Sequence, residues 1–225
     1  MKRVVAGVLS RRAEADVGAR ARLERAFEGL GSFRVFEDGP LTVAWTTQGD
    51  ERAVGSDDWL CVLDGTIYNL PAVLGEAGLA GGDVPGAGPS AEAMLAVAYS
   101  RRGEAMLARL RGDFALLCWN RRTHEGILVR DQLGCGSVAW SETSGGLVFA
   151  SEVSHLLALL PRTPGPDHAA VAHWLARSGQ PGGRTLYDGV FRLRPSHLLA
   201  LGPAPATPRR YWSPRYERPL RASRE

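Results

Sequence analysis

Short apolar runs separated by glycine, proline and polar turns dominate the pattern of this chain. Residues 59–63 and 114–119 are such runs, five and six residues long, which is typical of buried strands. The hairpin signal Ser144-Gly145-Gly146 separates two further runs. Other runs of the same kind lie at residues 4–9, 32–36, 41–46, 127–130, 138–140 and 147–150.

Helical periodicity is confined to a few segments. Residues 13–30 repeat apolar side chains at helical spacing, so we expect one long helix there. Ser90 and Asp167 stand before helical segments and have side chains that serve as N-caps. Residues 185–193 and 197–201 predict a final pair of strands. Strands and helices come in blocks rather than in strict alternation, which favours an α+β fold with antiparallel sheets.

The stretch at residues 59–74 combines a strand, a turn and a helix start. The strand is predicted to stop at Asp64-Gly65, because Asp-Gly after an apolar run favours a turn and glycine accepts a positive φ. A helix is expected to begin near Pro71, since the missing N–H of proline costs nothing in the first turn. Asp113, which follows Gly112, is also predicted to be a turn residue.

Composition places the chain among ordinary globular domains, with 44% hydrophobic and 23% charged residues among 225. No apolar run approaches the roughly 20 residues that span a bilayer. The apolar patch near the N-terminus is too short for a signal peptide, so we expect a cytoplasmic protein without membrane contact. Residues 48–58 and 80–89 predict surface loops. The net charge is +3 and the arginine pairs are scattered, so no nucleic-acid partner is expected.

Three widely spaced cysteines without a CxxC motif predict neither a disulfide nor a zinc site. Cys61 and Cys118 lie in apolar runs and are expected to be buried as small hydrophobic residues. Cys135, between two glycines, is the candidate reactive thiol, although no histidine or lysine is adjacent to activate it. The spacing of His168 and His173 does not put both on one helical face, so no metal site is expected.

Several segments resemble, in the same order, the amidotransferase half of asparagine synthetase B and its relatives. The segment LCVLDGTIYNL resembles the NGEIYN segment of these class II glutamine amidotransferase domains, and ILVRDQLGCGSVAW resembles their RDrlGikPLYy. VVAGVLS resembles their opening CGIAGVL, and RRYWSP resembles their final YW. The resemblance covers nearly the whole chain. It implies an amidotransferase-like domain at residues 1–208 and a tail at 209–225, where the synthetase domain of the family would begin.

The resemblance implies the N-terminal-nucleophile fold, in which two stacked antiparallel sheets lie between helical layers in the order αββα. It also implies a site with four parts. A cysteine made N-terminal is the nucleophile, and an asparagine amide with the next glycine N–H forms the oxyanion hole. An aspartate holds the α-amino group of the substrate, and an arginine clamps its carboxylate.

This sequence departs from the family pattern at all four parts of that site. Arg3 stands at the position of the cysteine, and a guanidinium cannot act as a nucleophile at pH 7. Asp64 replaces the asparagine before Gly65, and a carboxylate repels a developing oxyanion. Ser90 falls at the aspartate position, and residues 41–48 contain no arginine. We therefore expect no catalytic residue and a degenerate pocket at Asp64, Gly65 and Ser90.

The leading hypothesis is a catalytically degenerate domain that acts as scaffold or partner of an ATP-dependent, amide-forming synthetase. The resemblance points to peptide or natural-product biosynthesis, because β-lactam synthetase and lasso-peptide cyclases also carry an amidotransferase half without the cysteine. ATP and Mg²⁺ are expected in the partner synthetase and no cofactor in this chain. Formation of a homodimer is a further possibility that the sequence does not decide.

Two alternatives give the chain a function of its own. A hydrolase or transferase could use a relocated nucleophile, either Cys135 or Ser10 exposed by processing. A small-molecule sensor could use the vacated pocket, where Asp64 should favour a cationic ligand over glutamine.

Overall fold

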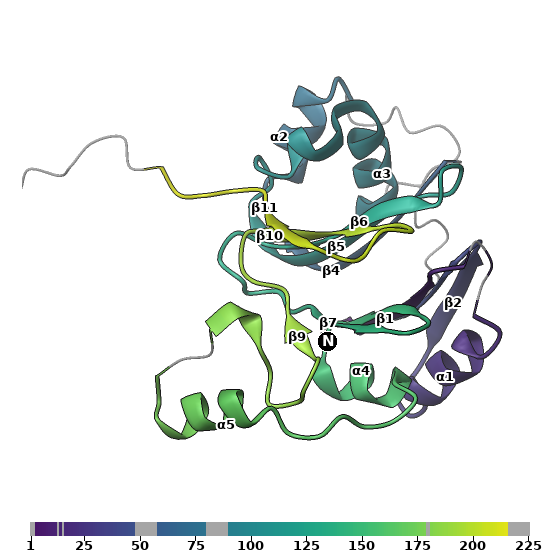
Figure 1. Cartoon of the computed structure of the whole chain (residues 1–225). Helices are drawn as coiled ribbons and strands as arrows, with labels where there is room; N and C mark the ends of the chain where they lie inside the picture. Colours follow the sequence, from purple (N-terminus) through teal and green to yellow (C-terminus); the bar gives the residue numbers. More distant parts are fainter. Residues whose placement is uncertain are drawn as a thin grey trace, which may run out of the picture.

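The computed structural model describes residues 3–12, 14, 16–47, 58–79, 90–178 and 181–215. Two antiparallel sheets are stacked face to face, and helices cover the outer face of each (Figure 1). The predicted αββα arrangement of two antiparallel sheets is therefore confirmed. The loop predicted at 80–89 and all but Asp58 of the loop at 48–58 lie outside the described residues.

The first sheet has six strands in the order β2-β3-β1-β8-β7-β9, so that β1 lies near its centre. Antiparallel neighbours flank β1 on both sides, with Gly7 opposite both Val43 and Phe149. The strands are β1 (Val5–Ser10), β2 (Phe33–Asp38), β3 (Leu41–Thr46), β7 (Ala139–Thr143), β8 (Gly146–Ala150) and β9 (Phe191–Arg192).

The second sheet has five strands in the order β11-β10-β6-β5-β4. Its neighbours are all antiparallel, and the longest pairing joins β4 to β5 from Trp59 opposite Asn120 to Ile67 opposite Gly112. The strands are β4 (Trp59–Ile67), β5 (Gly112–Asn120), β6 (Glu125–Arg130), β10 (His197–Leu201) and β11 (Pro208–Arg210). β11 therefore crosses position 208, where the sequence predicts the end of the domain.

Three layers of buried apolar side chains hold the four layers of secondary structure together. The central layer lies between the sheets and contains Trp45, Trp119 and Phe149. A second packs α2 (Leu70–Glu76) and α3 (Ala91–Arg102) on the five-stranded sheet. The third packs α1 (Ala19–Ala26) and α4 (Val153–Leu159) on the six-stranded sheet. No helix within the described ranges is long and apolar enough to cross a membrane.

The predicted turn at Asp64-Gly65 is wrong, because β4 runs on through both residues to Ile67. Gly65 has φ +114°, and a Cβ atom there would lie 2.0 Å from the carbonyl oxygen of Asp113. The glycine therefore allows close approach of the neighbouring strand rather than a chain reversal. Asp113 is a strand residue opposite Thr66, so its assignment to a turn is also wrong.

Two further predictions of regular structure need correction. The helix expected over 13–30 is shorter, since α1 begins at Ala19, after a turn in which Asp16 accepts a hydrogen bond from the N–H of Gly18. The strands expected at 185–193 and 197–201 do not pair. β9 joins β7 in one sheet, and β10 joins β6 in the other. The N-caps at Ser90 and Asp167, the latter on α5 (His168–Leu175), are confirmed.

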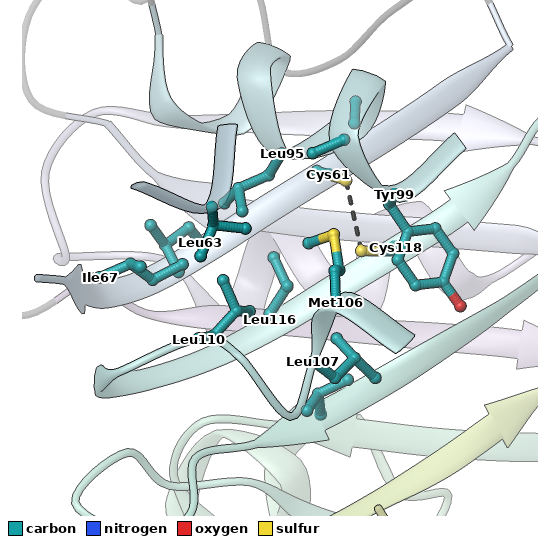
Figure 2. Packing of buried hydrophobic residues seen from close by; sticks show 14 of the residues in the cluster. Cys61, Leu63, Ile67, Leu95, Tyr99, Met106, Leu107, Leu110, Leu116 and Cys118 are labelled. Atoms are coloured by element: carbon teal, nitrogen blue, oxygen red, sulfur yellow. Dashed lines mark hydrogen bonds between the residues drawn. The ribbon is translucent and has the colours of Figure 1, made fainter. Parts of the chain in front are cut away.

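Cys61 and Cys118 lie directly opposite each other on β4 and β5, beneath α3 (Figure 2). Both side chains are fully buried, which confirms their predicted role as small hydrophobic residues. Their sulfur atoms are 3.3 Å apart as free thiols. Burial raises the pKa of Cys61, and the neighbouring Cys118 adds to that shift, so the thiol stays protonated.

The loop after β6 is organised around the carboxylate of Asp131, which is fully buried. Its two oxygens accept four backbone N–H groups, from Leu133, Gly134, Cys135 and Gly136, at 2.6–3.1 Å. The adjacent guanidinium of Arg130 donates to carbonyl oxygens of the same loop and of residue 193. The pair therefore anchors the loop.

We expect Asp131→Ala to lower the free energy of unfolding by about 3–5 kcal/mol, because four buried N–H groups lose a charged acceptor at once. Urea unfolding followed by circular dichroism measures the loss. Glu28→Ala is the control, since Glu28 is exposed and forms no ion pair with any described residue; its expected change is below about 0.5 kcal/mol. Equal losses for the two variants would contradict the anchoring role.

Candidate functional site

The candidate site lies at the start of β1, where the two sheets and α3 meet. Arg3 directly precedes Val4 and the strand, and its guanidinium extends toward the other sheet. Its Nη1 atom donates to the carbonyl oxygen of Leu63 on β4 at 2.9 Å. The same nitrogen donates to Oε1 of Glu92 on α3 at 2.5 Å. One side chain therefore joins β1, β4 and α3.

The Arg3–Glu92 ion pair is largely removed from water. The two side chains retain 16% and 12% of their accessible surface. Glu92 lies in the first turn of α3, where a carboxylate is favoured by the helix dipole. The sequence analysis missed Glu92. The available signal was its place two positions after the Ser90 N-cap, in the segment where the family has the aspartate that binds the substrate.

Ser90 has a structural task in this arrangement. Its hydroxyl oxygen accepts a hydrogen bond of 3.1 Å from the N–H of Ala93, which caps the first turn of α3. The cap fixes the beginning of the helix and with it the position of Glu92. Ser90 and Glu92 therefore share the first turn of α3, and Glu92 binds Arg3.

Asp64 follows Leu63, whose carbonyl oxygen binds Arg3, and is 97% buried in β4 (3% exposed). A cavity of about 10 Å³ beside it is lined mostly by apolar side chains of both sheets, among them Val5 and Phe149. That volume holds one water molecule at most. This cavity therefore cannot hold an amine ligand of the size of an amino acid.

Gly65 is the second residue of the predicted oxyanion position. Its backbone runs within the β4–β5 ladder opposite Phe114, and the carbonyl of Asp113 closes on the face where a Cβ atom would stand. The buried carboxylate of Asp64 precedes it in the strand. A carboxylate at this point has no N–H to donate to an oxyanion, unlike the amide of the family pattern.

The two proposed relocated nucleophiles lie in different surroundings. Ser10 is the last residue of β1, seven positions from Arg3, which corresponds to about 20 Å along a strand. Its hydroxyl oxygen accepts the N–H of Arg12 in the turn that follows. The structure therefore places Ser10 at the end of β1 that is remote from Arg3. Cys135 is exposed on the Asp131 loop.

Carboxylates surround the thiol of Cys135. A hydrogen bond to Asp113 raises the pKa of Cys135, and the charges of Asp113 and Asp131 act in the same direction. The same Asp113 carboxylate accepts a hydrogen bond of 2.6 Å from the hydroxyl of Tyr68. A raised pKa lowers the thiolate fraction, and the thiolate is the nucleophilic form. The environment of Cys135 is the reverse of one that activates a cysteine.

Among the described residues, no group of three or more His, Cys, Asp or Glu side chains is arranged to hold a metal ion. His168 and His173 lie on α5, where His173 Nδ1 is 2.9 Å from the hydroxyl oxygen of Ser178.

Comparison of sequences identifies relatives over most of the chain. Residues 48–212 match the family described as "Glutamine amidotransferase domain". A putative asparagine synthetase (glutamine-hydrolyzing) of Mycobacterium bovis is 32% identical over 165 residues, which are 71% of this chain and 25% of that protein. The amidase chry2 of Gibberella zeae is 26% identical over 47% of this chain and 15% of its own length. The chain thus spans about a quarter or less of these curated relatives.

Comparison of structures agrees on the fold. The glutamine phosphoribosylpyrophosphate amidotransferase from B. subtilis superposes with a TM-score of 0.61 at 14% sequence identity. The superposition covers 93% of this chain and 49% of that one. At this identity the likeness extends to the αββα fold and not to the side chains of the site.

We expect Glu92→Ala to lower the free energy of unfolding by about 2–4 kcal/mol, since it leaves the largely buried Arg3 without this carboxylate. Glu24→Ala is the matched control, because Glu24 forms an exposed ion pair with Arg20 at 2.9 Å; its expected loss is about 0.5 kcal/mol. Chemical unfolding of both variants gives the comparison. A loss for Glu92→Ala no larger than that of the control would show that the pair does not hold α3.

We expect slow alkylation of Cys135 by iodoacetamide at pH 7.5, slower than that of a free cysteine, because its raised pKa leaves little thiolate. Asp113→Asn should accelerate the reaction several-fold by removing the charge that opposes ionisation. Asp188→Asn, an exposed carboxylate elsewhere, is the control. Intact mass against time measures the rate. Fast, saturable labelling of the unchanged protein would favour a Cys135 nucleophile instead.

Proposed function

The chain belongs to the glutamine amidotransferase family, as a class II domain related to asparagine synthetase, and from that premise we propose that it is a pseudoenzyme. In this proposal the domain hydrolyses no glutamine. It serves as scaffold or partner of an ATP-dependent synthetase that forms amide bonds.

The observation that carries the proposal is the position and bonding of Arg3. In the family pattern this position holds the nucleophilic cysteine, freed at the N-terminus so that its own amino group can act as base. A guanidinium stays protonated and has no lone pair to offer an amide carbon. Here it is also engaged by Glu92 and by the carbonyl of Leu63. The position has become part of the packing of β1 against β4 and α3.

The remaining groups of the family site support the same reading. Asp64 brings a buried carboxylate to the oxyanion position, where a neutral hydrogen-bond donor is needed. The hydroxyl of Ser90 is used by the N–H of Ala93, as the helix cap. β3 (Leu41–Thr46), in which the carboxylate-binding arginine is expected, contains none. At Arg3 and Ser90, the group that the family uses on glutamine is replaced by one with a structural contact.

A synthetase partner follows from the relatives. The Mycobacterium bovis protein is called a putative asparagine synthetase, and this chain matches only a quarter of it. We propose that a synthetase domain, in a separate chain or in a longer form of this one, supplies ATP, Mg²⁺ and the acyl-activating chemistry. A role in peptide or natural-product biosynthesis extends this proposal by likeness to synthetases whose amidotransferase half lacks the cysteine.

Retention of the fold is consistent with a scaffold. Loss of catalysis has left the three apolar layers and the Asp131 anchor in place. A domain kept only as a remnant has no need of these features. A domain that presents surfaces to a partner needs all of them, because a rigid surface reduces the entropy lost on binding.

We expect the purified chain to release no glutamate from glutamine above the rate of buffer alone. An enzyme-coupled glutamate assay measures this, with Arg3→Ala and Cys135→Ser as companion variants. Saturable release that persists in Arg3→Ala and disappears in Cys135→Ser would replace the proposal with a relocated nucleophile.

We further expect the tagged protein, isolated from its own host, to carry an ATP-dependent synthetase or to belong to a chain much larger than 24.2 kDa. Native mass spectrometry of the isolated complex distinguishes these forms. A single 24.2 kDa species without a synthetase would contradict the scaffold role.

A further inference from the structure

A hollow of about 470 Å³ lies between the segment that follows η1 (Gly103–Met106) and the segment that follows β11. One wall consists of Ala108 and Arg109, and the other of residues 210–213 and Arg215. In Figure 1 the second wall is the yellow trace that leaves β11. The volume lies in the range of sites that bind small ligands or short peptide segments.

The hollow carries positive charge that the fold does not compensate. Arg109 is bound to Glu76, with 2.6 Å between the guanidinium and the carboxylate. Arg210 and Arg215 are exposed, and neither forms an ion pair with any residue that the structure describes. The nearby Glu104 carboxylate is bound to Arg209. Two guanidinium groups are thus available to an incoming anion.

Part of each wall is held by hydrogen bonds before anything binds. Arg210 lies opposite His197 in the β10–β11 pair. The backbone N–H of Tyr211 donates to the carbonyl of Ser196, and its hydroxyl donates to the carbonyl of Arg130 at 2.9 Å. The other wall is held by Asn69, whose amide donates to the carbonyl of Arg109 at 2.9 Å. A preformed site loses less conformational entropy on binding.

The residue types of the hollow match those that dominate protein–protein binding energies. Trp212 and Tyr211 are both half-buried and present aromatic surface, while arginines surround them. Tryptophan, tyrosine and arginine are the residues enriched at the energetic centres of such interfaces. The planar guanidinium also binds carboxylates through two parallel hydrogen bonds.

We propose that this hollow is a docking site for an acidic segment of the partner protein, with aspartate or glutamate side chains on Arg210 and Arg215. The proposal rests on the proposed function in so far as it takes that partner to be the synthetase. The two free guanidiniums are spread along an extended segment. That spacing suits successive carboxylates better than one compact phosphate group, which needs donors that converge.

The test uses the full chain and a fluorescein-labelled octaglutamate peptide, with fluorescence anisotropy as readout. Saturable binding that weakens with rising salt is expected for the unchanged protein. Arg210→Glu with Arg215→Glu should weaken it about tenfold or more, because each change turns attraction into repulsion. Arg122→Glu with Arg162→Glu is the matched control. Both residues are exposed, neither is in an ion pair with a described residue, and the net charge changes equally.

The affinity of the control variant for the peptide should fall by less than about threefold, which is the effect of the change in overall charge alone. Arg215→Glu by itself guards against damage to β11, since Arg215 lies outside every strand; it should still weaken binding. Equal losses in the two double variants, or no saturable peptide binding by the unchanged protein, would overturn the proposal. A third outcome would also overturn it: ATP binds saturably and more tightly than the peptide, and this binding is lost in Arg210→Glu/Arg215→Glu. The hollow would then be a site for small anions.

Capture experiments separate this proposal from the proposed function. If tagged protein captures no synthetase but octaglutamate binding depends on Arg210 and Arg215, the docking site stands and the synthetase is the wrong partner. If the unchanged protein and the Arg210→Glu/Arg215→Glu variant capture a synthetase equally, the scaffold role stands and the docking site is wrong.

Discussion

The guanidinium of Arg3 connects parts of the fold that are distant in sequence. It joins the start of β1 to Leu63 on β4 and to Glu92 on α3, across separations of 60 and 89 residues. Arginine and glutamate at these positions depend on each other, because either one alone would leave a charge in a largely buried place. Arg3, which the resemblance sets at the reactive position of the family, is thus a structural contact between two sheets and a helix.

In the proposed pseudoenzyme, that contact would keep the fold intact without the catalytic groups. A nucleophile must stay accessible to substrate, whereas the Arg3–Glu92 pair retains only 16% and 12% of its side-chain surface. Ser90 contributes by capping the helix that carries Glu92. Replacing Arg3 by the cysteine of the family pattern would therefore leave Glu92 without this partner in a largely buried place.

The sequence predicts the strands well and their long-range relations poorly. Apolar runs identify β1, β3, β5 and β8 because a buried strand needs little more than a short apolar run. The Asp64-Gly65 prediction failed because a glycine with positive φ serves equally well in a turn and where a neighbouring strand comes close. The strands at 191–192 and 197–201 entered different sheets, which local pattern cannot reveal. The αββα layering came from the resemblance and not from periodicity.

In the candidate site too, the sequence reveals the local features and misses the long-range contacts. Substitutions at Arg3, Asp64 and Ser90 are visible in sequence, since each stands within a recognisable segment. Glu92 was missed because its partner lies 89 residues away, and no local pattern marks an ion pair across that distance. The sequence identifies most members of the site, and the fold shows which of them contact each other.

The Asp131 loop links the inside of the domain to its proposed docking surface. Gln132 donates to the carbonyls of Leu107 and Leu110, on either side of the Ala108–Arg109 wall. The backbone carbonyl of Arg130 accepts a hydrogen bond from the hydroxyl of Tyr211 on the opposite wall, and the backbone carbonyl of Asp131 accepts one from the N–H of Ser196, next to β10. The loop that the Asp131 carboxylate organises therefore contacts both walls of the hollow through its neighbouring groups. In the proposed scaffold role, this loop is therefore needed for the surface that it holds in place, whatever residues stand at the reactive site.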